Sequence, residues 1–220
     1  MYKMSITENS NSANVIHLTK LNQNISVDRN FIVYGKRVTL VIPPSPFLLD
    51  ERVFVSLGVL RVAAALEQRG VVVGVLDLSG VSNYLEVIKL YLLENRPDWM
   101  GITCTTPQLP SSVRIARTIR EVLPGLRIVL GGPHVTLTYS ALKIERNKLN
   151  IIDGRASKAA KVLEDIFDVM VSGDGEFASN ELFKESCSKL IDGDDHKSNL
   201  FMTSAQYEAL PMPARHLVDM

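Results

Sequence analysis

The run VTLVIPP, residues 38–44, consists of β-branched and aliphatic residues and stops at two prolines. A short apolar run that ends at a turn signal is typical of a strand buried on both faces of a parallel sheet. Segments with apolar residues at helical spacing separate this run from four similar ones, at 71–78, 99–103, 127–130 and 168–172. We therefore expect an α/β fold, flavodoxin-like (Rossmann-like) and doubly wound, with a five-stranded parallel sheet in the order 2-1-3-4-5.

The two ends of the chain differ from this middle part. Residues 1–36 are rich in Asn, Ser, Thr and Lys, and we interpret them as a polar N-terminal lead-in with a short strand near 31–34. The α/β domain then occupies residues 37–195 and closes with a helix that includes Leu190. Residues 196–220 remain as a linker.

Composition and charge narrow the range of functions. Lys plus Arg and Asp plus Glu both number 24, so the formal net charge is zero. Nucleic-acid binders usually carry a basic excess, so we expect no nucleic-acid partner. Residues 1–20 lack the apolar core of a signal peptide, and the longest apolar run, 71–78, is too short to span a bilayer. Two separated cysteines, Cys104 and Cys187, fit a reducing compartment, so we expect a cytoplasmic protein without a membrane span.

Small and polar residues follow every predicted strand. Ligands of doubly wound sheets bind beyond the carboxyl ends of the strands, where the direction of the connections reverses. Glycine lets a backbone approach a ligand closely, and hydroxyl groups donate or accept hydrogen bonds. Gly and Pro are also common in ordinary loops, but five strand ends of this composition in one sheet favour a ligand-binding site at the edge where these ends lie. The candidate cofactor-binding residues are Pro44, Ser45, Asp77, Thr103, Cys104, Thr105, Thr106, Gly131, Gly132, Pro133, His134, Gly173, Asp174, Gly175 and Glu176.

Several other kinds of site are disfavoured. The first strand is not followed by GxGxxG, and the chain has no GxxxxGK[ST], which argues against a dinucleotide site and a P-loop. The histidines are scattered, so we expect no metal site built by the chain alone. Cys104 has no base beside it, and Glu176 is more typical of a first-turn carboxylate at a helix dipole than of an acid or base. We therefore assign no catalytic residue, and we expect a bulky side chain at Gly132 to fill the ligand groove.

A set of motifs in fixed order resembles a known family, the N-terminal cobalamin (vitamin B12)-binding domain of B12-dependent radical S-adenosylmethionine (SAM) proteins. The resemblance covers about residues 38–220 and includes the anaerobic magnesium-protoporphyrin monomethyl ester cyclase and radical SAM methyltransferases. Any one of these motifs alone would not identify the family, but their order and spacing together are specific for it. The motifs are LVIPP at 40–44, GIT at 101–103, VLGGPHVT at 129–136, VSGDGE at 171–176 and LPMPARHLVD at 210–219.

The resemblance implies a role for the chain. In that family the cobalamin domain precedes a barrel in which a CxxxCxxC motif holds a [4Fe–4S] cluster that cleaves SAM. This chain contains no CxxxCxxC. We therefore expect a cobalamin-binding module that is not catalytic alone, with a radical SAM barrel in cis that performs methyl transfer or cyclisation. The alternative is a degenerate module that keeps the fold without the cofactor and serves as an interaction or substrate-positioning domain. A flavin-binding or receiver domain is disfavoured, since a receiver needs acidic residues where this chain has Pro-Pro-Ser.

The loop after the first strand bears on how cobalt is held. The cobalamin domains of methionine synthase and the mutases place DxHxxG there, and the histidine ligates cobalt. Residues 43–50 of this chain contain no histidine. The resemblance therefore implies a cobalamin without a histidine ligand from this domain. His134 is the one histidine at a predicted strand end, and we expect it to cap the next helix or to touch the nucleotide tail.

Overall fold

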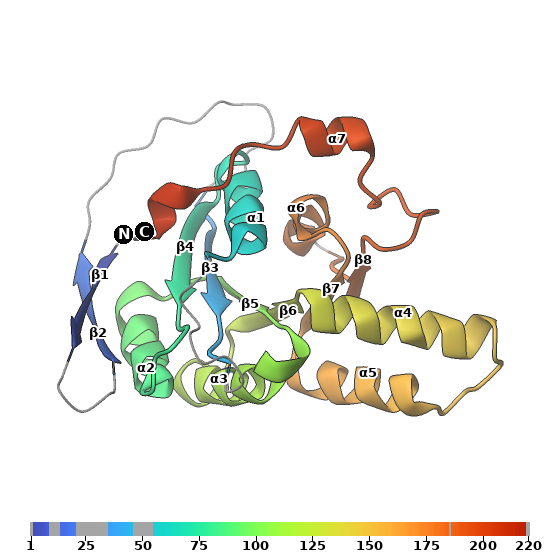
Figure 1. Ribbon diagram of the computed structural model, residues 1–220, viewed down its shortest axis with the longest axis horizontal. Coiled ribbons are helices and arrows are strands. Elements are labelled where there is room, and N and C mark those ends of the chain that lie inside the picture. Colours follow the sequence, from blue (N-terminus) through green and yellow to red (C-terminus); the bar gives the residue numbers. More distant parts are fainter. Residues whose placement is uncertain (1, 9–13, 21–34, 46–54, 185, 219–220) are drawn as a thin grey trace.

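The computed structural model describes residues 2–8, 14–20, 35–45, 55–184 and 186–218 (Figure 1). Its centre is a six-stranded sheet in the order β4-β3-β5-β6-β7-β8, in which every neighbouring pair is parallel. The strands are β3 (Arg37–Ile42), β4 (Val72–Asp77), β5 (Trp99–Thr103), β6 (Arg127–Gly131), β7 (Val169–Ser172) and β8 (Leu190–Asp192).

The predicted parallel α/β sheet and the order of its first five strands are confirmed, but the predicted number of strands is wrong. Leu190, which we expected in a closing helix, begins the sixth strand, and Ile191 pairs with Val171 of β7. In the described residues between β7 and β8, two short helices occur, α6 (Gly175–Ala178) and η2 (Ser179–Phe183). A strand of three residues is too short to show a periodic pattern, so pairing with β7 decides its conformation.

The first twenty residues contain a hairpin that the sequence analysis did not predict. Strand β1 (Tyr2–Glu8) pairs antiparallel with β2 (Asn14–Lys20) and forms a sheet of its own. Apolar and polar residues alternate in β1, which is the signal that could have indicated it. The strand expected near 31–34 lies outside the described residues.

The C-terminal segment lies along α1 (Leu57–Glu67), the helix that follows β3. It contains α7 (Ser204–Glu208) and a short turn, η3 (Arg215–Leu217). The backbone N–H of Ala214 donates to the carbonyl oxygen of Leu60 at 3.0 Å, and the guanidinium of Arg61 stacks over the Tyr207 ring at 4.2 Å. This segment, which includes the LPMPARHLVD motif, therefore packs on the domain up to the last described residues.

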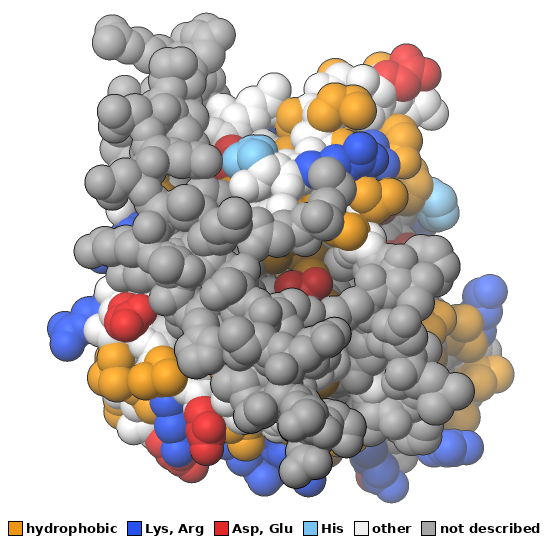
Figure 2. Space-filling view, turned by 60° about the vertical axis from the view of Figure 1, so that its left-hand side comes forward, with side chains coloured by type: hydrophobic (Ala, Val, Ile, Leu, Met, Phe, Trp, Pro, Cys, Tyr) orange, Lys and Arg blue, Asp and Glu red, His pale blue; other side chains and the backbone are white. Residues whose placement is uncertain are grey.

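Charges are mixed on the surface. Figure 2 shows one face on which Lys and Arg side chains are interspersed with Asp, Glu and apolar side chains wherever the residues are described. This distribution agrees with the zero net charge of the chain. None of the described helices is long and apolar enough to cross a bilayer.

Helices cover both faces of the sheet, as predicted for a doubly wound fold. On one face, α1 and α6 pack through Ala63, Leu66 and Ala178. The other face is covered by α2 (Tyr84–Asn95), α3 (Leu109–Val122), α4 (Pro133–Asn147) and α5 (Arg155–Ile166).

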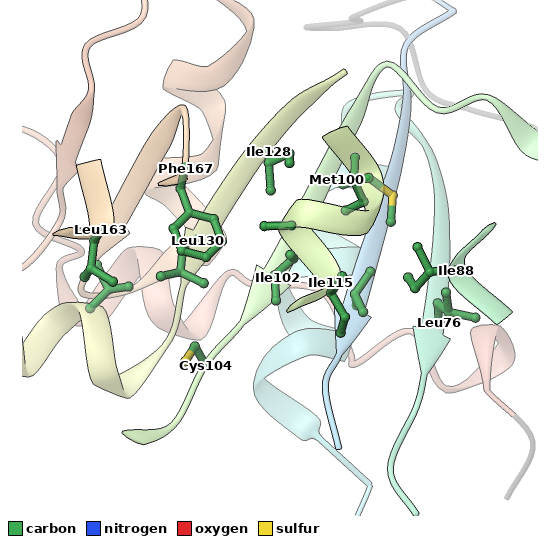
Figure 3. Close-up of a cluster of buried hydrophobic side chains, with 14 of the residues drawn as sticks. Leu76, Ile88, Met100, Ile102, Cys104, Ile115, Ile128, Leu130, Leu163 and Phe167 are labelled. Atoms are coloured by element: carbon green, nitrogen blue, oxygen red, sulfur yellow. The ribbon is translucent and has the colours of Figure 1, made fainter. Parts of the chain in front are cut away.

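Figure 3 shows the core of the second face, in which Ile88, Ile115 and Leu163 of the helices belong to one buried cluster with Ile102 and Leu130 of the strands. All five side chains are almost completely buried, so burial of apolar area on this face stabilises the sheet. The cluster ends at the carboxyl end of β5, where the loops of the candidate site begin.

Candidate functional site

The direction of the connections reverses at β3, because β4 lies on one side of it and β5 on the other. The loops that leave β3 and β5 are therefore neighbours at the switch point, the usual ligand position in doubly wound sheets. Pro44 and Ser45, which follow β3, are buried, whereas Thr105 and Thr106, which follow β5, are exposed. We call the ends of β3, β5 and β6, with residues 43–45, 104–108 and 131–134, the carboxyl edge.

Backbone hydrogen bonds hold the β5 end against the β6 end. The Cys104 N–H donates to the Gly131 carbonyl oxygen at 2.9 Å, and the His134 N–H donates to the Cys104 carbonyl oxygen at 2.9 Å. Thr106 Oγ1 and His134 Nδ1 form a further hydrogen bond at 3.0 Å. Burial lowers the pKa of His134 below its ordinary 6.5, so the ring is neutral at pH 7. His134 lies in the first turn of α4, whose N-cap is Gly132, so the expectation that His134 caps this helix is wrong.

The two adjacent glycines at the end of β6 have different environments. Gly132 has a φ of +93°, and a Cβ there would lie 2.8 Å from Thr103 Oγ1 and 2.9 Å from the Cys104 nitrogen. A Cβ on Gly131 would meet nothing closer than 3.7 Å. The backbone therefore requires glycine at 132, and a bulky residue there would disturb the fold before it could fill a groove. Gly131 is the position that leaves room at the carboxyl edge.

The VSGDGE turn lies beside the β6 end, since a Cβ on Gly131 would lie 3.7 Å from the Val171 oxygen, and it also contacts two further elements. Gly173 has a φ of +81°, and a Cβ there would lie 2.5 Å from Gly193 and Asp194, just beyond β8. A Cβ on Gly175 would lie 3.1 Å from Val62 of α1. The turn is therefore packed against α1 and the end of β8.

Glu176, the last residue of the turn, is buried beside Arg61 of α1, with Nε and Oε1 3.9 Å apart. Burial raises the pKa of this carboxyl above its ordinary range, and Asp174 adds to the rise. The salt bridge to Arg61 opposes the shift but does not cancel it. Asp77, at the end of β4, accepts a hydrogen bond from the Ser79 nitrogen at 2.9 Å and so closes its own turn.

Cys104 has the environment of a core residue. Its side chain is completely buried, and its thiol lies 3.1 Å from the Thr105 carbonyl oxygen. Burial raises the pKa of the thiol to about 11, so the thiolate is scarcely populated at neutral pH. The sequence favours a half-buried cysteine at a strand end, but Cys104, which follows β5, is completely buried.

Two residues of this region were missing from the sequence-based candidates. Gln108 bridges the loops after β3 and β5, and Thr136 Oγ1 accepts a hydrogen bond from the Gly173 nitrogen at 2.9 Å. The T-x-x-Q spacing of Thr105 and Gln108 is a capping-box pattern and could have indicated Gln108. Thr136 lies within the GGPHVT motif, but no local pattern shows that it contacts a turn 37 residues away.

Comparison with known proteins assigns the family. A family model described as B12 binding domain matches residues 51–164. The chain belongs to this family. The matched residues contain the ends of β4, β5 and β6, but neither residues 43–45 nor the turn at 173–176. No curated protein matches the chain.

A solved structure with a detectable likeness is that of TsrM, a radical SAM methyltransferase from Kitasatospora setae, with a tryptophan substrate and the SAM analogue aza-SAM bound. The two chains are 19% identical over 61% of this chain, with a TM-score of 0.40. The likeness spans 27% of the TsrM chain, so this B12-binding chain corresponds to only part of that protein.

The chemistry of the carboxyl edge fits a cobalamin. The groups at its surface are uncharged: the hydroxyls of Thr105 and Thr106, the neutral His134 ring and the half-buried backbone at Gly131. Hydroxyls and backbone amides match the neutral amide side chains that surround a corrin ring. A corrin brings its own cobalt, so the protein needs no cluster of metal ligands, and the described residues hold none.

Proposed function

We propose that this chain binds cobalamin at the carboxyl edge of its sheet, as the cofactor-binding module of a larger B12-dependent radical SAM enzyme. The observation that carries the proposal is the B12-binding family match, which spans the β5 and β6 parts of this edge. When bound, cobalamin supplies a cobalt centre that can carry a methyl group. The chain's own groups that would hold and orient it are the exposed hydroxyls of Thr105 and Thr106 and the backbone at Gly131.

We further propose that no histidine of the domain ligates cobalt. The support is the loop after β3, where the histidine-ligated cobalamin domains have their ligand, because residues 43–50 contain no histidine. Electron paramagnetic resonance of the Co(II) form tests this, because an axial nitrogen splits the lines into triplets. We also propose that the base of the nucleotide tail is displaced from cobalt, so we expect lines without triplet splitting in the parent, and triplets that persist in His134→Ala would contradict that displacement. Triplets that vanish in His134→Ala would identify His134 as a ligand and contradict the proposal.

The proposed organisation of the full protein follows the motifs. Residues 37–195 form the cobalamin domain, and 196–220 lead to a radical SAM barrel in cis. The support for this is the LPMPARHLVD motif at 210–219 and its order after VSGDGE. Methyl transfer or cyclisation would then require the [4Fe–4S] cluster and SAM of that barrel, and this chain alone would only hold the cobalamin.

Retention of hydroxocobalamin tests the proposed function directly. The chain is purified with added hydroxocobalamin and desalted, and the visible spectrum of the protein fraction is recorded. Gly131→Trp places a bulky side chain at the carboxyl edge, where its Cβ makes only ordinary contacts. Gly125→Trp is the matched control, since Gly125 precedes β6 at the opposite edge and a Cβ there meets nothing within 4 Å.

We expect the parent and Gly125→Trp to retain cobalamin and Gly131→Trp to lose it, with far-UV circular dichroism unchanged in all three. A parent that retains none would contradict cobalamin binding and favour the degenerate module. A Gly131→Trp protein that binds as well as Gly125→Trp would show that the cofactor lies elsewhere.

A further inference from the structure

One side chain connects the two loops at the switch point. Gln108 lies at the end of a short helix, η1 (Thr106–Gln108), directly after the β5 end. Its oxygen Oε1 accepts hydrogen bonds from the Thr105 nitrogen at 3.0 Å and from Thr105 Oγ1 at 2.9 Å. Its nitrogen Nε2 donates to the carbonyl oxygen of Pro43 at 2.8 Å, across 65 residues of sequence.

These partners determine the chemistry that the position requires. The Thr105 nitrogen can only donate, and the Pro43 carbonyl can only accept. The side chain at 108 must therefore present an acceptor at one terminal atom and a donor at the other, which is the pattern of an amide. A carboxylate of the same length could satisfy Thr105 but not Pro43, because it has no hydrogen to donate at neutral pH.

The bridge lies where a ligand of this fold binds. Pro43 is buried and begins the loop that leaves β3, whereas Thr105 is exposed and begins the loop that leaves β5. The ends of these two neighbouring strands lie at the switch point, where ligands of doubly wound sheets bind. A bond between the residues that follow them fixes their spacing before a ligand binds, which lowers the entropic cost of binding.

We propose that Gln108 is a positioning residue for cobalamin, because its amide holds Pro43 at a fixed spacing from Thr105. This inference rests on the proposed cobalamin binding. Loss of the bridge lets Pro43 leave its binding-competent position, and the apparent affinity falls with the competent fraction.

Gln108→Glu tests the inference with a change of one group. The variant keeps both acceptor contacts to Thr105, so the local cap survives, and loses only the bond to Pro43. The chain offers a matched control in Gln206, whose Oε1 accepts from the Thr203 nitrogen at 2.9 Å and from Thr203 Oγ1 at 3.1 Å. The Gln206 amide nitrogen donates to none of the described residues, so Gln206→Glu makes the same chemical change without breaking a bridge.

Hydroxocobalamin binding is followed by stopped-flow absorbance and by equilibrium titration, and both are normalised to the fraction of folded protein. We expect Gln108→Glu to bind about tenfold more weakly, about 1.4 kcal/mol, chiefly through slower association. Gln206→Glu should bind as the parent does. Melting of the ligand-free proteins reports any purely structural effect.

Equal binding by the two variants would overturn the role of Gln108. So would a lower melting temperature of Gln108→Glu with unchanged association per folded molecule, since the bridge would then serve only stability. Failure of the parent to bind hydroxocobalamin would instead remove the proposed function itself.

Discussion

Replacing Gly132 by alanine should destabilise the protein far more than the same change at its neighbour. Gly132 has φ +93° and ψ −176°, a conformation that is almost restricted to glycine. A Cβ there would also lie 2.9 Å from the Cys104 nitrogen and 3.1 Å from the Cys104 carbonyl oxygen. Both Cys104 groups are hydrogen-bonded, to Gly131 and His134, so they cannot move away without loss of those bonds.

The magnitude follows from two contributions. An alanine held in this backbone region costs about 1–3 kcal/mol. Relief of a contact with backbone atoms adds about 1–3 kcal/mol, as overpacking does elsewhere. Taking the lower half of each range, we expect Gly132→Ala to lower the free energy of unfolding by about 3 kcal/mol. In a chain of this size that corresponds to a fall in Tm of about 6–12 °C.

Urea unfolding and thermal melting of Gly131→Ala, Gly132→Ala and Gly125→Ala measure the effect. A Cβ at Gly131 makes ordinary contacts and a Cβ at Gly125 makes none, so both variants should stay within about 1 kcal/mol of the parent. If Gly132→Ala were as stable as Gly131→Ala, the strained backbone and close contacts at Gly132 would not be those of the folded protein.

Three further predictions concern titratable groups. In the folded protein, iodoacetamide should label the half-buried Cys187 much faster than the fully buried Cys104, whose pKa is raised to about 11, and mass spectrometry after brief labelling would reveal the opposite order. Burial lowers the pKa of His134 in the folded state. The contribution of His134 to stability is therefore present above the ordinary pKa of 6.5 and is lost as the pH falls from 6.5 through the lowered pKa of the folded state. The stability difference between parent and His134→Gln should therefore shrink from pH 7.5 to 5.5, and a constant difference would contradict this. Because burial raises the pKa of Glu176, the folded state loses stability as the pH rises from the ordinary carboxyl value through the raised one. Glu176→Gln should therefore gain stability relative to the parent between pH 4.5 and 8, and unfolding curves in which it loses stability over that range would refute the assignment.

The sequence by itself determined the α/β class, the order of the five longer strands and the chemical character of the strand ends. Fully buried parallel strands must be apolar throughout, so runs such as 38–42 and 127–130 stand out against the helices between them. Glycines and prolines mark where those runs stop. The cobalamin-binding family could also be predicted, because its motifs occur in fixed order along the chain.

Only the tertiary structure decided which strand-end residues meet. Hydrogen bonds such as those of Gln108 with Pro43 and of Thr106 with His134 join residues far apart in the chain. No local sequence pattern indicates which of these residues pair. The three residues of β8 are a strand because β7 offers an open edge. The two glycines look alike in sequence, but the backbone requires glycine only at 132, since its positive φ and close steric contacts depend on how β5 and β6 pack. A Cβ on Gly131 would make only ordinary contacts.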